Sequence, residues 1–166
     1  GPKLVDAEDP AFIREFGETM TPFGASVPLV ENELDQAQHD GLSDVLAVSS
    51  AGMLVRQSLW ERLDGFDPAL PTVDDGLDFC TRARLAGFRV TLVAQARVAL
   101  GGDGVAGPNL SSKWTVRRRL AGERRRAQLH RRMVYAPGWA VPLHWLTLVP
   151  LAILRGLVRL LRKEPG

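Results

Sequence analysis

Apolar and polar residues change their spacing along the chain, and the change separates strand-like segments from helix-like ones. Residues 45–56 hold two short apolar runs around a Ser-Ser-Ala-Gly break, which predicts a strand with a kink or bulge. Residues 74–86 have apolar positions at helical spacing and are followed by Gly87, a typical helix C-terminus. A strand is expected at about 89–93. This alternation over residues 45–95 favours an α/β fold.

The segments on either side predict two more helices and a loop. Residues 9–19 are expected to form a short helix, because an Asp-Pro pair is typical of a helix start. Residues 22–44 are irregular and acidic, which indicates a long surface loop. A further helix is expected to begin at Ser58, which has capping-box spacing to Glu61, and to end at Gly65.

The net charge of the chain is only +2, but its charges are strongly segregated. Residues 1–112 contain 8 basic and 17 acidic residues, whereas residues 113–166 contain 13 basic and 2 acidic residues. An acidic globular part is therefore joined to a basic tail, which favours a polyanionic partner, either a membrane or a nucleic acid. The single cysteine excludes an internal disulfide.

Composition divides the chain into four parts. They are a globular domain at 1–100, a Gly-rich connector at 101–112, a basic helix at 113–135 and an apolar segment at 136–166. The apolar segment has 16 residues without formal charge, fewer than the roughly 20 that span a bilayer. It either lies in the plane of the membrane, crosses it, or docks on the domain. The in-plane arrangement is favoured, because a span would place Arg155 and Arg159 in lipid.

A membrane is the favoured partner of the basic tail. The apolar segment follows the basic helix directly, and no nucleic-acid-binding module is recognisable, so no nucleic acid is expected. The side chains expected to contact an anionic membrane surface are Arg117, Arg118, Arg119, Arg124, Arg125, Arg126, Arg131, Arg132, Trp139 and Trp145. The Trp residues suit the interfacial region.

Two adjacent aspartates open the helix predicted at 74–86, and two interpretations of them stay open. Asp74 or Asp75 can cap free backbone N–H groups, where negative charge also suits the helix dipole. Alternatively, one of these carboxylates removes a proton from a substrate hydroxyl. At about 100° per residue, Asp75, Asp78 and Arg82 share one face of the helix, so Arg82 can orient Asp78.

Four segments, taken in order, resemble the C-terminal half of a family 2 glycosyltransferase. They are "GPKLVD", "DVLAVSSAGMLVRQSLWERLDGFDPAL", "DDGLDFCTRARLAGFRVTLVAQARV" and the basic-then-apolar tail. The resemblance implies a partial GT-A-type (Rossmann-like) α/β domain with a basic, membrane-associated helical tail. The implied activity is inverting transfer of a sugar from a nucleotide-sugar to a hydroxyl of a cell-envelope glycan or glycolipid. The implied location is the cytoplasmic face of a bacterial plasma membrane.

The resemblance also implies roles for individual residues. The general base is a carboxylate of the acidic pair, Asp75 or Asp74, and Asp75 is favoured. The positions implied for substrate binding are Ser50, Ala51, Gly52, Trp60, Phe66, Asp78 and Arg82. The spacing from the acidic pair to Arg82 departs by one residue from the family pattern, so the choice of base stays open. Gln128 and Arg131 are similar to the Gln-x-x-Arg-Trp motif of processive synthases, a spacing that arises easily by chance in so Arg-rich a segment.

Metal-binding signals are missing from the sequence. The family's Asp-x-Asp motif is absent, and His39, His130 and His144 lack metal-ligand spacing, so no metal site is predicted in this chain. The complete enzyme is expected to use Mg²⁺ or Mn²⁺. The chain is therefore expected to be a fragment that lacks the nucleotide-binding half and is inactive alone. A non-catalytic membrane-surface interaction module is the main alternative, and a nucleic-acid-binding fragment is a weaker one.

Overall fold

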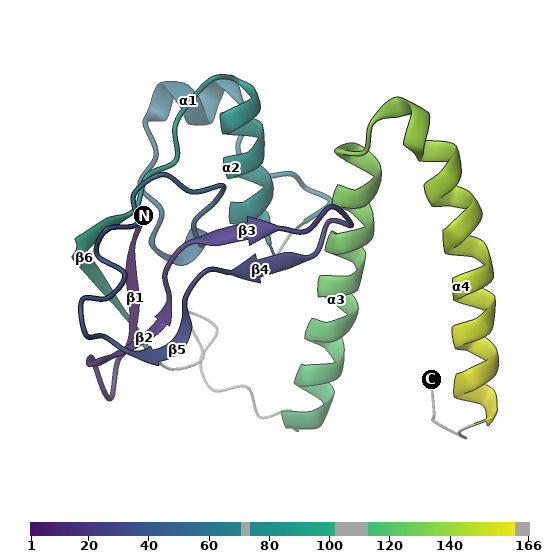
Figure 1. Ribbon diagram of the computed structural model, residues 1–166, viewed down its shortest axis with the longest axis horizontal. Helices are drawn as coiled ribbons and strands as arrows, with labels where there is room; N and C mark the ends of the chain where they lie inside the picture. Colours follow the sequence, from purple (N-terminus) through teal and green to yellow (C-terminus); the bar gives the residue numbers. More distant parts are fainter. Residues whose placement is uncertain (71–73, 102–112, 162–166) are drawn as a thin grey trace.

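The computed structural model describes residues 1–70, 74–101 and 113–161 (Figure 1). A four-stranded sheet forms the centre, and a two-stranded hairpin extends from it toward the C-terminal helices (Figure 1). In sheet order the strands are β5 (Glu31–Leu34), β2 (Phe12–Glu15), β1 (Pro2–Asp6) and β6 (Val93–Leu100), and the hairpin pairs β3 (Glu18–Met20) with β4 (Ser26–Pro28). The helices, in chain order, are η1 (Ser50–Gly52), α1 (Gln57–Arg62), α2 (Asp75–Leu85), α3 (Lys113–Val134), η2 (Gly138–Ala140) and α4 (Val141–Leu161).

The central sheet mixes parallel and antiparallel pairing. β1 runs antiparallel to β2 and parallel to β6, and β2 runs antiparallel to β5. α2 packs on this arrangement through Leu77, which is fully buried together with Ile13 and Phe16 in the main apolar core. The α/β class expected from the sequence is confirmed.

The helix expected at residues 9–19 is wrong, because this segment forms β2 and β3. Asp9 opens a turn instead of a helix, and its carbonyl accepts a hydrogen bond from the N–H of Phe12 at 3.0 Å. Pairing of β2 with two neighbours and burial of Ile13 outweigh the local Asp-Pro signal. The loop expected at 22–44 is also wrong in part, since it contains β4 and β5.

The kinked strand expected at 45–56 is replaced by less regular structure. In this segment, all of which the structure describes, isolated bridges join Ala47 to Glu18 and the preceding Asp44 to Thr91. The 3₁₀ turn η1 then follows. The strand expected at 89–93 begins later, as β6, where it can pair in parallel with β1.

The two helices predicted to end at Gly65 and Gly87 are confirmed as α1 and α2, but the capping interaction predicted for α1 does not form. α2 ends before Gly87, whose φ is 88° and whose N–H bonds the carbonyl of Arg84 at 3.0 Å. α1 ends before Gly65 (φ 67°), but the capping box of Ser58 and Glu61 does not form. Glu61 instead accepts a hydrogen bond from the Gln57 amide at 2.7 Å, one turn away.

The basic helix predicted at 113–135 is confirmed as α3, which ends at Val134. α4 stands on the far side of α3 from the sheet, and the two helices form a hairpin (Figure 1). Arg132 holds this hairpin near its turn by donating to Nδ1 of His144 at 2.8 Å and to the Thr147 hydroxyl at 3.0 Å. Within the described residues, no helix combines the length and the apolar character needed to cross a membrane. The connector predicted at 101–112 lies, apart from Gly101, outside the described residues.

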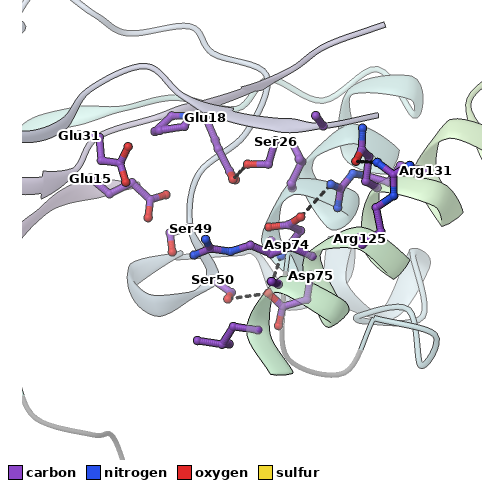
Figure 2. A pocket seen from close by; sticks show the side chains of 18 residues that line it. Glu15, Glu18, Ser26, Glu31, Ser49, Ser50, Asp74, Asp75, Arg125 and Arg131 are labelled. Atoms are coloured by element: carbon purple, nitrogen blue, oxygen red, sulfur yellow. Dashed lines mark hydrogen bonds and ion pairs between the residues drawn. The ribbon is translucent and has the colours of Figure 1, made fainter. Parts of the chain in front are cut away.

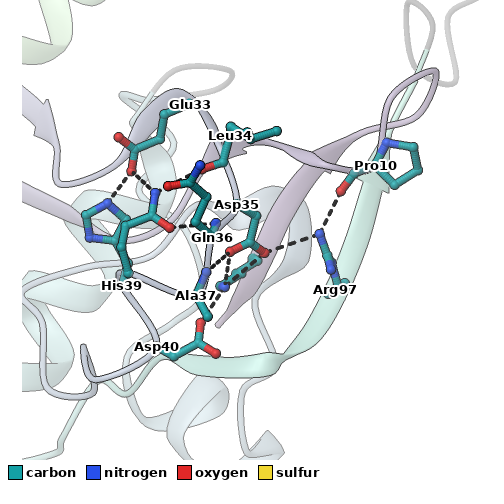
Figure 3. Close-up of polar contacts among 11 residues, drawn as sticks. Pro10, Glu33, Leu34, Asp35, Gln36, Ala37, His39, Asp40 and Arg97 are labelled. Carbon is teal, nitrogen blue, oxygen red and sulfur yellow. Dashed lines mark hydrogen bonds and ion pairs between the residues drawn. The ribbon is translucent and has the colours of Figure 1, made fainter.

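A buried lysine ties the segment after β5, which includes Asp35 and Asp40 (Figure 3), to the centre of the sheet. Nζ of Lys3, on β1, lies 2.8 Å from Oδ1 of Asp35 and 2.5 Å from Oδ1 of Asp40. Arg97, on β6, lies 3.3 Å from the other oxygen of Asp35 and donates to the carbonyl of Pro10 at 2.6 Å. The hydrogen bond from Lys3 lowers the pKa of Asp35, so the carboxylate stays charged although its side chain is only 9% exposed.

Replacing Lys3 with Met should leave the buried Asp35 charge without its main partner. We expect K3M to lower the free energy of unfolding by about 3 kcal/mol, measured by urea denaturation at pH 7. The matched control is R14M, because Arg14 forms an ion pair with Asp6 while 52% of its side chain is exposed. That control should cost less than about 1 kcal/mol, and equal losses in the two variants would contradict the role of Lys3.

Candidate active site

A cavity of about 900 Å³ opens where the β3–β4 hairpin and β2 face the start of α2 and one side of α3. Its lining is divided by charge. The acidic wall consists of Glu15, Glu18 and Glu31, and the floor contains Ser50, Asp74 and Asp75. The basic wall, on α3, consists of Arg124, Arg125, Gln128 and Arg131. Figure 2 shows the three glutamates on one side of the two aspartates and Arg131 on the other.

Asp74 begins α2 in an unusual conformation. It is the N-cap residue, with φ 59° and ψ 21°, and its carbonyl accepts the first helical hydrogen bond from the N–H of Asp78 at 3.1 Å. Its side chain makes no capping bond, so the capping interpretation is wrong for Asp74. One carboxylate oxygen instead lies 2.7 Å from Nη2 of Arg131. The αL region is uncommon for residues other than glycine, although aspartate tolerates it better than most.

Asp75 points toward Ser50, the first residue of η1. Its Oδ1 accepts a hydrogen bond from the Ser50 hydroxyl at 2.7 Å and lies 2.7 Å from the backbone nitrogen of Gly76 (Figure 2). Gly76 is needed here, because a Cβ at that position would lie 2.6 Å from the Ser50 nitrogen and 2.8 Å from the Val48 carbonyl oxygen. The structure thus brings together Ser50 and both aspartates at one cavity.

Ala51 and Gly52 are not part of this cavity lining. Gly52 faces β1 instead, since a Cβ there would lie 2.8 Å from Pro2 and 2.9 Å from Leu4. Within η1, Gly52 therefore packs against β1, whereas Ser50 lines the cavity.

Asp78 and Arg82 lie together, as their helical spacing predicted, but they anchor the fold beside the cavity. Arg82 Nε donates to Asp78 at 2.8 Å, and its other nitrogens donate to the carbonyls of Leu63 and Gly65. Asp78 is buried and also accepts a hydrogen bond from the Tyr135 hydroxyl at 2.5 Å. Burial and this bond raise the pKa of Tyr135. The network joins α2 to the turn after α1 and to the end of α3.

Trp60 and Phe66 also lie away from the cavity lining, in an aromatic cluster with Phe79. The ring centroid of Trp60 is 4.9 Å from that of Phe66 and 5.3 Å from that of Phe79. Trp60 covers Gly65, where a Cβ would lie 2.9 Å from the indole ring. These contacts pack α1 against α2.

Asp67, Asp78 and His130 form the one group among the described residues with metal-ligand geometry, their ligand atoms lying within 4.8 Å of one another. The group is a poor fit for a divalent ion. Arg82 and Tyr135 already occupy the Asp78 carboxylate, and the Arg82 guanidinium would repel a second cation. His130 and Asp67, 3.0 Å apart, form instead a polar contact between α3 and the turn after α1.

Some of the arginine side chains of α3 point toward the interior of the protein or into the cavity. The Arg131 side chain is 0% exposed, so the membrane contact predicted for this residue is wrong. Arg124 and Arg125 line the cavity, and Arg132 lies over the Phe23 ring at 5.4 Å. Arg119, Arg126, Trp139 and Trp145 are exposed, whereas the side chains of Arg117 and Arg118 lie outside the described residues.

The acidic wall was not predicted from the sequence. Gln128 and Arg131, whose spacing is similar to a family motif, both face the cavity. Glu15 and Glu18 went unnoticed because a helix was expected there. In β2, Ile13 is buried and Glu15, two residues further on, lies on the same face of the strand.

The carboxyl groups of Glu15 and Glu18, in the acidic wall, are held in an environment that favours their protonated forms. Burial, and then the charges of Glu18, Glu31 and Asp74, raise the pKa of Glu15 to about 7. Burial also raises the pKa of Glu18, and the hydrogen bond that Ser26 donates to it opposes this shift. Near neutral pH the wall can therefore gain or lose a proton.

Replacing Glu15 with Gln should change the pH dependence of stability. The folded protein binds the Glu15 proton more tightly than the unfolded chain does, so its stability falls as pH rises from about 4.5 to 7 and stays lower above that. We expect E15Q to exceed the wild type at pH 8 by on the order of 1 kcal/mol in free energy of unfolding, and to match it at pH 4.5. Urea denaturation across this range measures the difference.

The control for E15Q is E8Q, which makes the same change at an exposed position. Its stability should follow that of the wild type at every pH. Parallel curves for E15Q and the wild type would show that burial does not perturb Glu15.

Comparison with known proteins gives one match. The model of a family described as "Glycosyltransferase like family 2" matches residues 12–136. This range runs from β2 to just beyond α3 and includes both walls of the cavity. Comparisons with curated proteins and with solved structures found no match.

Proposed function

The chain belongs to the glycosyltransferase-like family 2, and from that premise we propose that its cavity is the acceptor side of an inverting catalytic centre. The donor would be a nucleotide-sugar, and the acceptor a hydroxyl of a cell-envelope glycan or glycolipid. The mixed α/β fold fits a partial GT-A domain. The observation that carries the proposal is the placement of Asp75 on the cavity floor, oriented by Ser50.

Asp75 is better suited than Asp74 to act as the general base. Asp74 is 14% exposed, and its carboxylate is already engaged in an ion pair with the buried Arg131. In the proposed step, the acceptor hydroxyl gives its proton to the Asp75 carboxylate while its oxygen attacks the anomeric carbon. The bond from that carbon to the diphosphate oxygen breaks on the opposite face, which inverts the configuration.

The basic wall gives the cavity affinity for an anionic group. Arg124 and Arg125 lie across from the acidic wall, and guanidinium groups bind phosphate well. The proposal places a phosphate of the donor or of a lipid-linked acceptor against them. The hydroxyls of a sugar would then lie toward the acidic wall, whose carboxylates accept hydrogen bonds.

A divalent metal is part of the proposed complete enzyme, where it would stabilise the leaving diphosphate. The group of Asp67, Asp78 and His130 fits such an ion poorly, because Arg82 and Tyr135 already occupy the Asp78 carboxylate, and the whole sequence contains no Asp-x-Asp. The proposal therefore assigns the metal and the nucleotide to residues outside this chain. Sugar transfer by the purified chain alone with Mg²⁺ or Mn²⁺ would overturn this part.

The proposal also places the enzyme at the cytoplasmic face of a bacterial membrane, and the surface of the C-terminal hairpin favours the membrane association. Trp139 and Trp145 are 80% and 61% exposed, and α4 has further exposed apolar side chains at Leu143, Leu146 and Ile153. Together with the exposed arginines of α3, this surface suits the interface of an anionic bilayer. The alternative, a non-catalytic membrane-surface module, shares this surface but makes no use of Asp75.

Separate substitutions of the two aspartates test the assignment of the base in the full-length enzyme. D75N should lower kcat by about 100- to 10,000-fold with little change in melting temperature, because Asn cannot accept the proton. D74N should lower the melting temperature, because Arg131 loses its buried counter-charge. Sugar transfer and thermal unfolding measure the two effects. A D75N variant that keeps its activity would refute the assignment.

The membrane surface can be tested by co-sedimentation of this chain with vesicles of anionic lipid. We expect the double variant W139A/W145A to bind at least about tenfold more weakly, because two large apolar side chains no longer enter the interface. L54A/L85A is the matched control, since both leucines are exposed on the globular part. Equal losses in the two double variants, or stronger binding of the wild type to duplex DNA than to vesicles at equal salt, would contradict the proposal.

A further inference from the structure

We propose that Arg131 is a positioning residue that holds Asp74 in its left-handed conformation and thereby aims the Asp75 carboxylate into the cavity. This inference rests on the proposed function, since it assigns Arg131 a part in the same reaction. Arg131 lies 57 residues from Asp74 in sequence, on α3, and reaches it across the edge of the cavity (Figure 2).

The Arg131 guanidinium is fixed by two partners in a fully buried setting. Nε and Nη2 donate to the Gly24 carbonyl at 3.0 Å and 2.9 Å, and Nη2 also donates to Asp74 at 2.7 Å. Gly24 permits this contact because it lies flush with α3, where a Cβ would be 2.7 Å from the Gln128 carbonyl oxygen. The guanidinium therefore has little freedom, and the Asp74 carboxylate is held with it.

The third nitrogen of this group indicates a role other than stability. Among the described residues, Nη1 of Arg131 is buried and has no hydrogen-bond partner. A buried cation with an unsatisfied donor is unfavourable for folding, and an apolar side chain of similar size would avoid that cost. What an apolar side chain could not do is hold the Asp74 carboxylate.

The backbone angles of Asp74 determine where Asp75 points. Asp74 has φ 59°, and the next residue begins the helix, so a change to extended or right-handed angles would redirect the first turn of α2. The Ser50 hydroxyl donates a hydrogen bond to Oδ1 of Asp75 at 2.7 Å. Gly76 already lies against the backbone of residues 48–50, so α2 cannot move closer to that segment. Asp75 is therefore held by Ser50 through its side chain and by Arg131 through the preceding residue.

The experiment measures kcat and KM in the full-length enzyme for R131K, D74G and the double variant D74G/R131K. Lysine keeps the buried charge but cannot serve both Gly24 and Asp74 with the same geometry. We expect R131K to lower kcat by about 100-fold, as a misplaced catalytic group does, with KM for the nucleotide-sugar changed less than about threefold. Adding D74G should restore kcat about tenfold relative to R131K, because glycine adopts the left-handed angles unaided.

The control is R89K, the same substitution in an Arg–Asp pair whose arginine is 72% exposed and 3.2 Å from Asp44. It should leave kcat and KM unchanged. If R131K keeps its kcat, or if the double variant is no faster than R131K, Arg131 does not act through Asp74 and the inference is overturned. A rise in KM for the donor as the main effect would also overturn it, because Arg131 would then contact the substrate.

Two further comparisons keep the outcome clear. If thermal unfolding shows that R131K is not folded, D74A and D74G are compared instead. Both variants remove the carboxylate, but only alanine disfavours the left-handed backbone angles. D74G should then have about tenfold higher kcat, and equal values would overturn the inference. The D75N variant distinguishes failure of the proposed general base from failure of the proposed role of Arg131. An active D75N refutes the base itself, whereas an inactive D75N with an active R131K refutes only the role of Arg131.

Discussion

The guanidinium of Arg131 lies entirely inside the protein, and a buried charge is tolerated only where partners surround it. Its partners are the Gly24 carbonyl and the Asp74 carboxylate, so the tip of the β3–β4 hairpin and the start of α2 must meet α3 at one place. The absence of a side chain at Gly24 lets the hairpin approach α3 closely, and the absence of one at Gly76 lets α2 approach the backbone of residues 48–50. The floor of the cavity and two of its sides therefore depend on this single contact.

Around that contact, the cavity separates its charges instead of pairing them. The acidic wall is partly buried and has few counter-charges of its own, which is why the pKa of Glu15 rises to about 7. The basic wall faces it across the space that a ligand would fill. A molecule with hydroxyl groups at one end and an anionic group at the other matches both walls, and a sugar phosphate has that chemistry.

Local signals predicted local structure well. The ends of α2 and α3 and the turn at Gly87 follow from helical spacing and a C-terminal glycine. The Asp-Pro signal failed because pairing between distant strands outweighed it, and no local pattern reports such pairing. In the site, Ser50 and the two aspartates followed from the family's motif order. The contact between Arg131 and Asp74 could not be predicted, because one arginine among many in α3 gives no sign of which side faces inward.

The hydrogen bond from Arg131 to Gly24 joins residues 107 positions apart in the chain. This separation affects the stage of folding at which the site forms. Contacts of high sequence separation require a large loop to close, which makes them slow to form and raises the contact order of the fold. The pairing of β1 with β6 in the sheet also joins distant residues, such as Lys3 and Arg97, and the basic wall is added only when α3 docks. Partial detachment of α3, a form of local unfolding, would take away the wall and the support of Asp74 together while the sheet stays intact.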